Sequence, residues 1–208
     1  MNNRPVKIDE LTIEDHYYLT LGEDDCYYFG SYYKDYRNPS PDNDHSLISN
    51  LKKKPSMALL PGYHYKNAAI IKVAAFFNAS FSDEKLQSVT LVPIPPSKIK
   101  GHAEYDDRML KILQIAFKGR SADIRELVEQ IESTESTHTL GVRLTISEIE
   151  GNIRINENLA DALKETIFLV DDVLTSGTHF KAIKNVLTKR FPNVRVAGIF
   201  VCRRVIEA

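Results

Sequence analysis

The sequence has few of the residues that indicate a disulfide-bonded or zinc-binding scaffold. Its two cysteines, Cys26 and Cys202, are not part of a CxxC pair. Its six histidines show neither HxxxH nor HxxE spacing, so the pattern does not predict an intrinsic zinc site. We expect two reduced thiols that are buried in a cytosolic protein.

The chain also lacks a charge excess of either sign and a long apolar run. The formal net charge of its 208 residues is −1, which gives no bulk attraction to nucleic acid or to an acidic membrane. No apolar run approaches the roughly 18 residues that span a bilayer. Residues 1–19 lack the basic and then apolar order of a secretory signal. We therefore expect a cytoplasmic protein without a membrane partner and without direct nucleic-acid binding.

The first part of the chain is interpreted as an N-terminal hood with the first helices. With 43% hydrophobic residues, the chain can fill one core. The tyrosine-rich residues 25–37 predict one or two strands with a turn near Gly30. Residues 65–77 carry apolar side chains at helical spacing and predict a helix. We assign residues 1–88 to the hood and helices, packed on a core of residues 89–208.

The second part of the chain alternates strands with helices. VTLVPIP, from Val89, is a short apolar strand that prolines end, and MLKILQIAF has helical spacing. Residues 124–131 fit a helical face, but the alternation favours a strand there. ETIFLVDD, HFKAIKNVLTKRF and VRVAGIFVCRR then predict a strand, a helix and a strand. This order predicts an open α/β parallel sheet flanked by helices, with ligands beyond the carboxyl ends of the strands.

One stretch at such a strand end, IFLVDDVLTSGTHF from Ile167, combines two acids with a small hydroxyl-rich turn. The turn Thr175–Thr178 precedes a helix, where backbone N–H groups are unsatisfied, and Gly177 allows close approach. These features favour a nest for a phosphate monoester. The alternative, that Ser176 or Thr178 only caps the helix, stays open.

The acid pair extends the phosphate hypothesis to a sugar phosphate. Asp171 and Asp172 repel each other, and their burial costs free energy unless a partner compensates it. Two carboxylates can accept hydrogen bonds from a ribose cis-diol and can help to hold hydrated Mg²⁺. Acids for the sugar and a nest for its phosphate together indicate a ribose-5-phosphate site.

Residues 167–179 closely resemble the phosphoribosyl-pyrophosphate motif of type I phosphoribosyltransferases. The resemblance implies that family's open parallel sheet with a small N-terminal hood. It implies that Asp171 and Asp172 are catalytic, hold the ribose hydroxyls, and bind Mg²⁺ through these hydroxyls or water. It also implies a 5′-phosphate site formed by Thr175, Ser176, Gly177 and Thr178.

Other segments are similar to the ComF-like branch of that family. LVPIPPSKIKG matches its strand and basic loop, EIEGNIRIN from Glu148 loosely matches its ERxxN stretch, and YYFGSYYKDY with LISNLKK matches its tyrosine strand and following helix. Three features differ. The CxxC zinc module is absent, KGHAEYDDR replaces an RGFNQ-like stretch, and Thr175 stands where hypoxanthine-type enzymes carry an aspartate. The accepting base therefore stays open.

The implied reaction is transfer of a phosphoribosyl group to a nitrogenous base with release of pyrophosphate. Ser97, Lys98 and Lys100 are the candidate pyrophosphate-binding residues, and Arg108 is a further source of positive charge. A solvated basic loop is the alternative for the lysines. Residues 133–143 are polar and long enough for a mobile lid.

Two other functions stay open. The first alternative is a catalytically weak or inactive effector that senses phosphoribosyl pyrophosphate or a related nucleotide and works with partner proteins. The second is a nucleotide or sugar-phosphate hydrolase. The oligomeric state, including a homodimer, is also left open.

Overall fold

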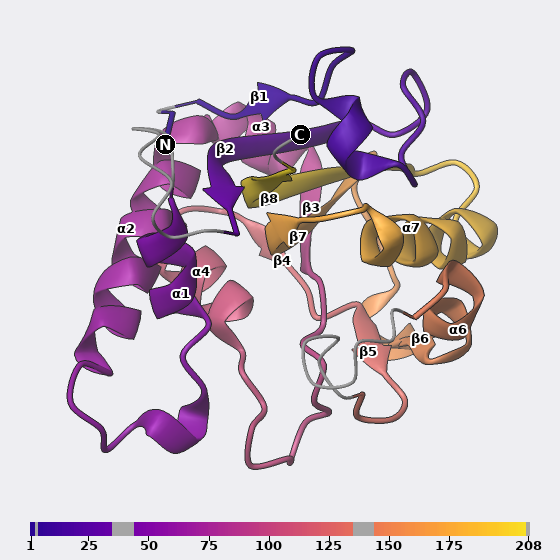
Figure 1. Ribbon diagram of the computed structural model, residues 1–208. Coiled ribbons are helices and arrows are strands. Elements are labelled where there is room, and N and C mark those ends of the chain that lie inside the picture. The colour runs from indigo at the N-terminus through magenta and orange to yellow at the C-terminus, as the bar shows by residue number, and fades with distance from the viewer. Residues whose placement is uncertain (3, 35–43, 135–143, 207–208) are drawn as a thin grey trace.

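The computed structural model describes residues 1–2, 4–34, 44–134 and 144–206, and a six-stranded sheet lies at its centre (Figure 1). The strand order is β1-β2-β8-β7-β3-β4. All neighbouring pairs are parallel except β1 with β2. This arrangement confirms the predicted α/β class with a mostly parallel sheet. The bounds are Val6–Lys7 for β1, Cys26–Tyr33 for β2, Val89–Pro93 for β3, Asp123–Ile124 for β4, Thr166–Leu174 for β7 and Arg195–Val205 for β8.

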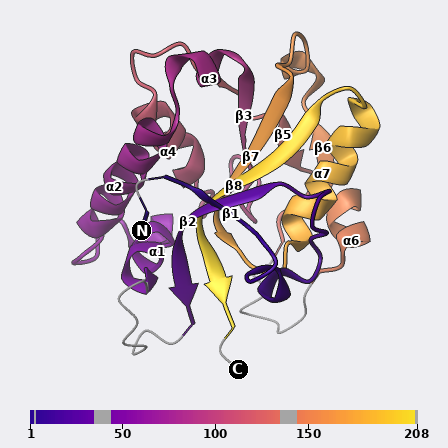
Figure 2. The same cartoon turned by 90° about the horizontal axis from the view of Figure 1, so that it is seen from above.

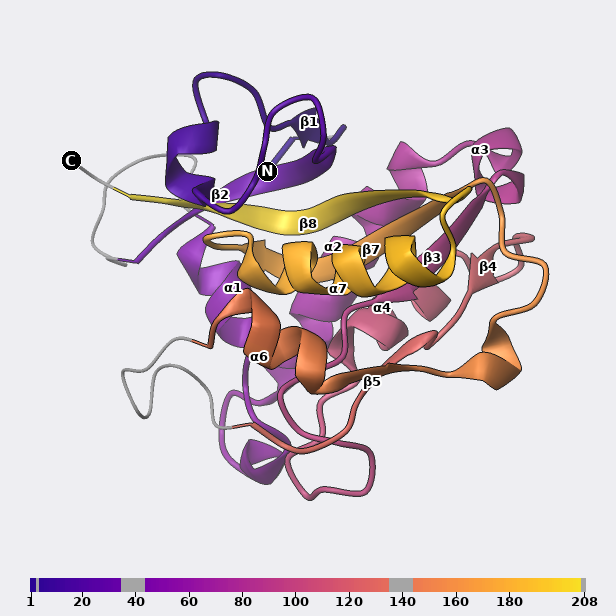
Figure 3. The ribbon, with the colours of Figure 1, turned by 90° about the vertical axis from the view of Figure 1, so that its right-hand side faces the viewer.

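Helices cover both faces of the sheet (Figures 2 and 3). Helices α1 (His45–Leu51), α2 (His64–Ser80), α3 (Asp83–Gln87) and α4 (Arg108–Ala116) lie on one face. Helix α7 (Thr178–Arg190) covers the other face, with α6 (Ile146–Gly151) packed beside it. A separate two-stranded antiparallel sheet pairs β5 (Val128–Gln130) with β6 (Ile153–Ile155). Short 3₁₀ turns span Ile13–His16, Pro55–Met57 and Glu157–Leu159.

The apolar pattern of the sequence accounts for these layers. Strand β7 has buried residues on both faces, as expected for a strand between two helical layers. Helix α2 buries the face formed by Ala69, Ile70, Val73, Ala74 and Phe77, which confirms the predicted helix. Cys26 and Cys202 are free and buried, as predicted.

The strands settle two local predictions. The turn near Gly30 is wrong, because β2 runs straight through it and pairs Gly30 with Cys202. Glycine is needed there since a Cβ atom would lie 2.1 Å from an Asp44 carboxylate oxygen. The ambiguous residues 124–131 contain strand β5 and the end of β4 and no helix.

The prediction that the acid pair lies at the end of its strand is wrong by two residues. Strand β7 continues past both acids to Leu174. Asp171 pairs with Phe200 of β8, and Val173 pairs with Cys202. The apolar residues after the acids extend the strand because β8 continues beside them.

Residues 1–88 contribute β1 and β2 to the same sheet that holds β3. They also contribute α1, α2 and α3 to one helical layer. The boundary at residue 88 stays a prediction. None of the helices in the described ranges is long and apolar enough to span a membrane.

Candidate functional site

The strand order changes direction between β3 and β7. The chain leaves β3 toward β4 on one side and leaves β7 toward β8 on the other. Ligands in open α/β sheets bind at such a switch point, beyond the carboxyl ends of the strands. The loop after β3 begins beside the acid pair, because the Ile94 N–H donates to the Val170 carbonyl at 2.9 Å.

Asp171 and Asp172 have different surroundings because successive side chains of a strand point to opposite faces. Asp171 is partly buried and lines a cavity of about 220 Å³. Asp172 is 3% exposed and pairs with cations from α4 and from the end of α1. The pair therefore does not present two equivalent carboxylates to one ligand.

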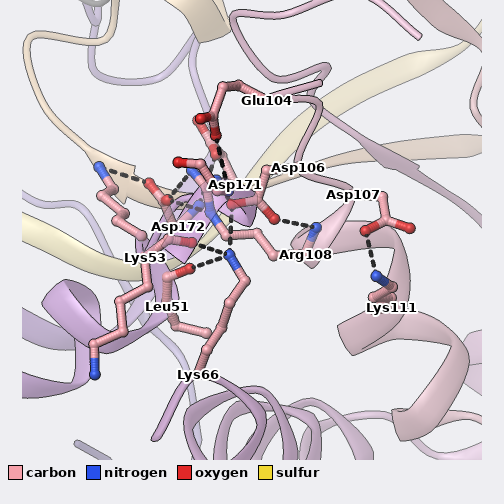
Figure 4. Close-up of polar contacts among 12 residues, drawn as sticks. Leu51, Lys53, Lys66, Glu104, Asp106, Asp107, Arg108, Lys111, Asp171 and Asp172 are labelled. Carbon is pink, nitrogen blue, oxygen red and sulfur yellow. Dashed lines mark hydrogen bonds and ion pairs between the residues drawn. The ribbon is translucent and has the colours of Figure 1, made fainter. Parts of the chain in front are cut away.

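Both carboxylate oxygens of Asp172 have cationic partners, of which Figure 4 labels Arg108. Arg108 donates to Oδ2 from Nε at 2.9 Å and from Nη2 at 2.6 Å. Lys52 Nζ lies 3.1 Å from Oδ1. Burial alone would raise the pKa of Asp172, but Lys52 and Arg108 hold it well below its usual range. Asp172 is therefore ionised and neutralised by its neighbours.

The ion pairs continue beyond Arg108 to a buried lysine. Arg108 Nη1 donates to Asp106 Oδ2 at 2.7 Å. The same oxygen accepts a hydrogen bond from Lys66 Nζ at 2.7 Å, and Lys66 is 5% exposed. Lys66, Asp106, Arg108, Asp172 and Lys52 thus form one continuous chain of alternating charges.

The negative charge of Asp171 is compensated less than that of Asp172. Its Oδ1 accepts the Asp172 N–H at 2.7 Å. Burial and the nearby Asp172 carboxylate raise the pKa of Asp171 to about 7, although Arg108 opposes the shift. Asp171 is therefore the acid of the pair whose charged form is less stabilised by its surroundings.

The cavity beside Asp171 lies between the loop after β3, the start of α4 and the two-stranded β5–β6 sheet. Lys98 and Lys100, predicted for pyrophosphate, line it together with Asp171. The rest of its wall is mixed, with apolar residues such as Pro95, Ile99 and Val128 beside charged ones, among them Asp106, Asp107, Arg108, Glu126, Glu129 and Arg154. The structure thus gathers one of the two acids and both lysines around one space.

Lys100 already has acidic partners in this cavity. Its Nζ lies 3.0 Å from Glu126 Oε2 and 3.6 Å from Glu129 Oε1. Ser97 does not line the cavity, and its carbonyl accepts the Thr134 N–H at 2.8 Å. Of the predicted lid, residues 135–143 lie outside the described ranges.

The predicted phosphate turn lies at the start of α7. Gly177 has φ +89° and precedes Thr178, the first helical residue. Within the described residues, the backbone N–H groups of Ser176, Gly177 and Thr178 have no acceptor. The hydroxyls of Ser176 and Thr178 lie 2.7 Å apart. Backbone N–H donors and hydroxyls at the start of a helix are the groups that bind anions in such turns. None of these residues lines the cavity beside Asp171.

An N-terminal segment that the sequence did not connect with the site fixes the other side of this turn. His16 Nδ1 forms a hydrogen bond with the Thr175 carbonyl, and the Tyr18 N–H donates to the Ser176 carbonyl at 3.0 Å. The Leu19 side chain packs over Gly177 so closely that a Cβ atom there would lie 2.8 Å away. The carbonyls of Thr175 and Ser176 are therefore occupied by the N-terminal segment.

The sequence reasoning missed four residues of this site. Lys52 and Asp106 stand in polar stretches without a distinguishing pattern, and His16 precedes a tyrosine pair. Lys66 carries a signal in retrospect, since it lies three and four residues before the buried Ala69 and Ile70 of α2. A lysine on the apolar face of a helix indicates a buried ion pair.

The acid pair is a partial match to a magnesium site. Across the described ranges, no three His, Cys, Asp or Glu residues are grouped so as to hold a metal ion. Asp172 is saturated by Arg108 and Lys52, so Asp171 is the carboxylate of the pair that is left for a cation. Mg²⁺ is often held by one or two carboxylates with water and substrate oxygens. Asp171 alone would thus fit only an ion that takes its other ligands from water and from a bound molecule.

Comparisons with known proteins give limited additional information. No protein-family model matches the chain, and no curated protein matches it. A hypoxanthine phosphoribosyltransferase from Staphylococcus aureus is similar in two crystal forms. The tetragonal form is 18% identical over 66% of this chain and 73% of that chain, with a TM-score of 0.37. The orthorhombic form is 16% identical over 67% and 74%, with a TM-score of 0.36. At these TM-scores the likeness carries no functional weight, and the function is inferred from the site itself.

Proposed function

We propose that the protein binds phosphoribosyl pyrophosphate with Mg²⁺ and transfers the phosphoribosyl group to a nitrogenous base, with release of pyrophosphate. The observation that carries this proposal is the shared cavity of Asp171, Lys98 and Lys100 at the switch point between β3 and β7. The backbone N–H groups of Ser176, Gly177 and Thr178, which have no acceptor within the described residues, support it further, since they follow the same strand.

Each part of this substrate has a chemical partner. The turn at the start of α7 would bind the 5′-phosphate through backbone N–H groups and hydroxyls. Asp171 would accept hydrogen bonds from the ribose hydroxyls, and Lys98 and Lys100 would bind pyrophosphate from the cavity wall. Ser97, outside the cavity, would contribute only from the same loop. Asp172 would not contact the ligand and would act through the effect of its negative charge on Asp171.

Mg²⁺ would be held by Asp171 through water or the ribose hydroxyls, and mainly by oxygens of the substrate. When bound, it would supply positive charge to the departing pyrophosphate. The chain itself contributes Lys98 and Lys100 to the same negative group.

Calorimetric titration with phosphoribosyl pyrophosphate and Mg²⁺, together with pyrophosphate release across a panel of bases, tests the proposal. We expect the wild-type protein to bind and the Asp171→Asn variant to bind about tenfold or more weakly, because it loses charged hydrogen bonds. Asp161, an exposed acid outside the site, supplies the matched control Asp161→Asn. Absence of binding by the wild type, or equal affinity of the two variants, overturns the proposal.

A second function is favoured by two observations. Both oxygens of Asp172 are held by cations, and Thr175 stands where hypoxanthine-type enzymes carry an aspartate. A site of this kind can bind the sugar phosphate as a signal and transmit its presence to partner proteins without turnover. Binding in calorimetry with no pyrophosphate release on any base would select this sensing role, whereas steady turnover of one base would exclude it.

A further inference from the structure

Lys66 is a buried cation that does not touch the acid pair. It lies in the first turn of α2 and is 5% exposed. Its ammonium donates to the Leu51 carbonyl at 3.0 Å, to the Lys53 carbonyl at 2.6 Å and to Asp106 Oδ2 at 2.7 Å. All three protons of the ammonium are thereby used, so Lys66 has no capacity left to bind a ligand.

The two carbonyls lie on either side of Lys52. Leu51 is the last residue of α1, and Lys52 caps that helix. Carbonyls at a helix C-terminus lack intrahelical partners and carry partial negative charge, so a buried ammonium is a strong partner for them. Because Lys66 fixes the backbone before and after Lys52, it sets the point from which the Lys52 side chain reaches Asp172.

Asp106, the third acceptor of Lys66, also binds Arg108, the second cationic partner of Asp172. Asp106 Oδ2 accepts from both Lys66 and Arg108 Nη1. The guanidinium of Arg108 is a rigid planar fork. Asp106 on one edge therefore orients the Nε and Nη2 groups that donate to Asp172. Figure 4 shows Lys66 directed toward Leu51 and Asp106, with Arg108 between Asp106 and Asp172.

We propose that Lys66 is a positioning residue that holds both cationic partners of Asp172 in place, Lys52 through the backbone of α1 and Arg108 through Asp106. Lys52 is 44% exposed in its side chain. A flexible lysine of that exposure gains little from an isolated ion pair because its side chain loses entropy. A fixed backbone origin reduces this cost.

Double-mutant cycles in urea unfolding test this arrangement without any ligand. The coupling between Lys52 and Asp172 is measured with Lys52→Met and Asp172→Asn, first in the wild type and then in the Lys66→Met background. We expect a wild-type coupling of about fivefold in the unfolding equilibrium constant, which disappears when Lys66 is replaced. A coupling of the same size in both backgrounds overturns the proposal.

The Asp106→Asn variant gives a second test, which still applies if Lys66→Met does not fold. It removes the charge between Lys66 and Arg108 and leaves the bonds of Lys66 to the α1 carbonyls. The Arg108–Asp172 coupling should then fall, while the Lys52–Asp172 coupling should not change. If both couplings are unchanged in Asp106→Asn, the Arg108 arm is refuted. Lys72→Met, an exposed change on the same helix, is the control and should affect neither coupling.

The binding consequence rests on the proposed function and is measured separately. Lys66→Met should weaken binding of phosphoribosyl pyrophosphate with Mg²⁺ by about fivefold or more, whereas Lys72→Met should not. If the wild type does not bind this ligand, the proposed function fails and the unfolding cycles still decide the role of Lys66. If the wild type binds and Lys66→Met binds equally well, Lys66 does not position the site.

Discussion

Arg108 and Asp172 are 64 residues apart in the sequence, and two guanidinium nitrogens of Arg108 donate to one carboxylate oxygen of Asp172. The side chains are 18% and 4% exposed. This pair joins helix α4 to strand β7 at the point where the sheet changes direction. It also explains how an acid remains charged inside the core next to another acid.

Replacement of Arg108 should destabilise the protein strongly. Arg108→Met leaves Asp106 and Asp172 without their shared cation, and breaking a buried pair from one side costs about 3–5 kcal/mol. Urea unfolding of the variant and the wild type measures this loss. Arg190→Met is the matched control, because Arg190 and its partner Glu157 are 52% and 59% exposed. The control should lose less than about 1 kcal/mol. Similar losses in the two variants would show that the Arg108 pair is not the buried contact described above.

His16 should make stability depend on pH. Burial lowers its pKa from the ordinary value of 6.5, while the Thr175 hydrogen bond and Asp15 act in the opposite direction. The unfolded chain then takes up the proton at a higher pH than the folded chain. The contribution of His16 to the free energy of unfolding is therefore fully present above about pH 6.5. It is lost as the pH drops through that value toward the lower folded pKa, with a slope of up to about 1.4 kcal/mol per pH unit.

The His16→Asn variant isolates this contribution. Its amide can still donate to the Thr175 carbonyl but does not titrate. Unfolding free energies between about pH 5 and pH 8 should decline less steeply in this variant than in the wild type. His64→Gln, an exposed histidine change, should keep the wild-type slope. Identical slopes for His16→Asn and the wild type would contradict the prediction.

Lys100 should bind pyrophosphate better when its acidic neighbours are weakened. In the structure it pairs with Glu126 and Glu129, and an incoming anion has to compete with both. Glu126→Gln removes one competitor and one repulsive charge. We expect affinity for pyrophosphate to rise by up to about fivefold, the range of a half-exposed ion pair, as measured by calorimetry. Glu84→Gln, on the exposed surface of α3, should leave the affinity unchanged. Equal affinity in both variants argues against a role of Lys100 in anion binding.

The layered fold was predictable because local patterns encode it. The apolar runs of β3, β7 and β8 and the helical spacing of α2, α4 and α7 occur within single segments, and each predicted its element. The acid pair and the glycine of the turn were also visible, since they follow one buried run. The sequence therefore predicted at which edge of the sheet the candidate site lies.

The arrangement inside that site was less predictable. The two residues after Asp172 are apolar and signal that the strand continues, which would have placed the acids on opposite faces. The partners of Asp172 come from α1 and α4, and their approach depends on helix packing that no local pattern specifies. Likewise, nothing in the residues around His16 indicates that they close over Thr175. Long-range contacts of this kind depend on the tertiary fold.

Gly177 should be the residue of the turn that tolerates substitution least. Its φ of +89° is unfavourable for any other residue, and a Cβ atom would meet Leu19 side-chain atoms at 2.8 and 2.9 Å. Gly177→Ala should therefore lower the free energy of unfolding by about 1–3 kcal/mol and weaken phosphate binding. Gly22 has φ +83° with nothing within 4 Å of its Cβ position, so Gly22→Ala separates the backbone cost from the clash.

The Leu19→Ala change completes this test. If the contact with Leu19 adds to the backbone strain, Gly177→Ala should cost more than Gly22→Ala in urea unfolding, and the excess should shrink in the Leu19→Ala background. Equal losses at the two glycines would mean that the N-terminal segment does not hold the turn. An excess that depends on Leu19 would tie the shape of the phosphate turn to residues 16–19, because their contacts decide which side of the turn is open to a ligand.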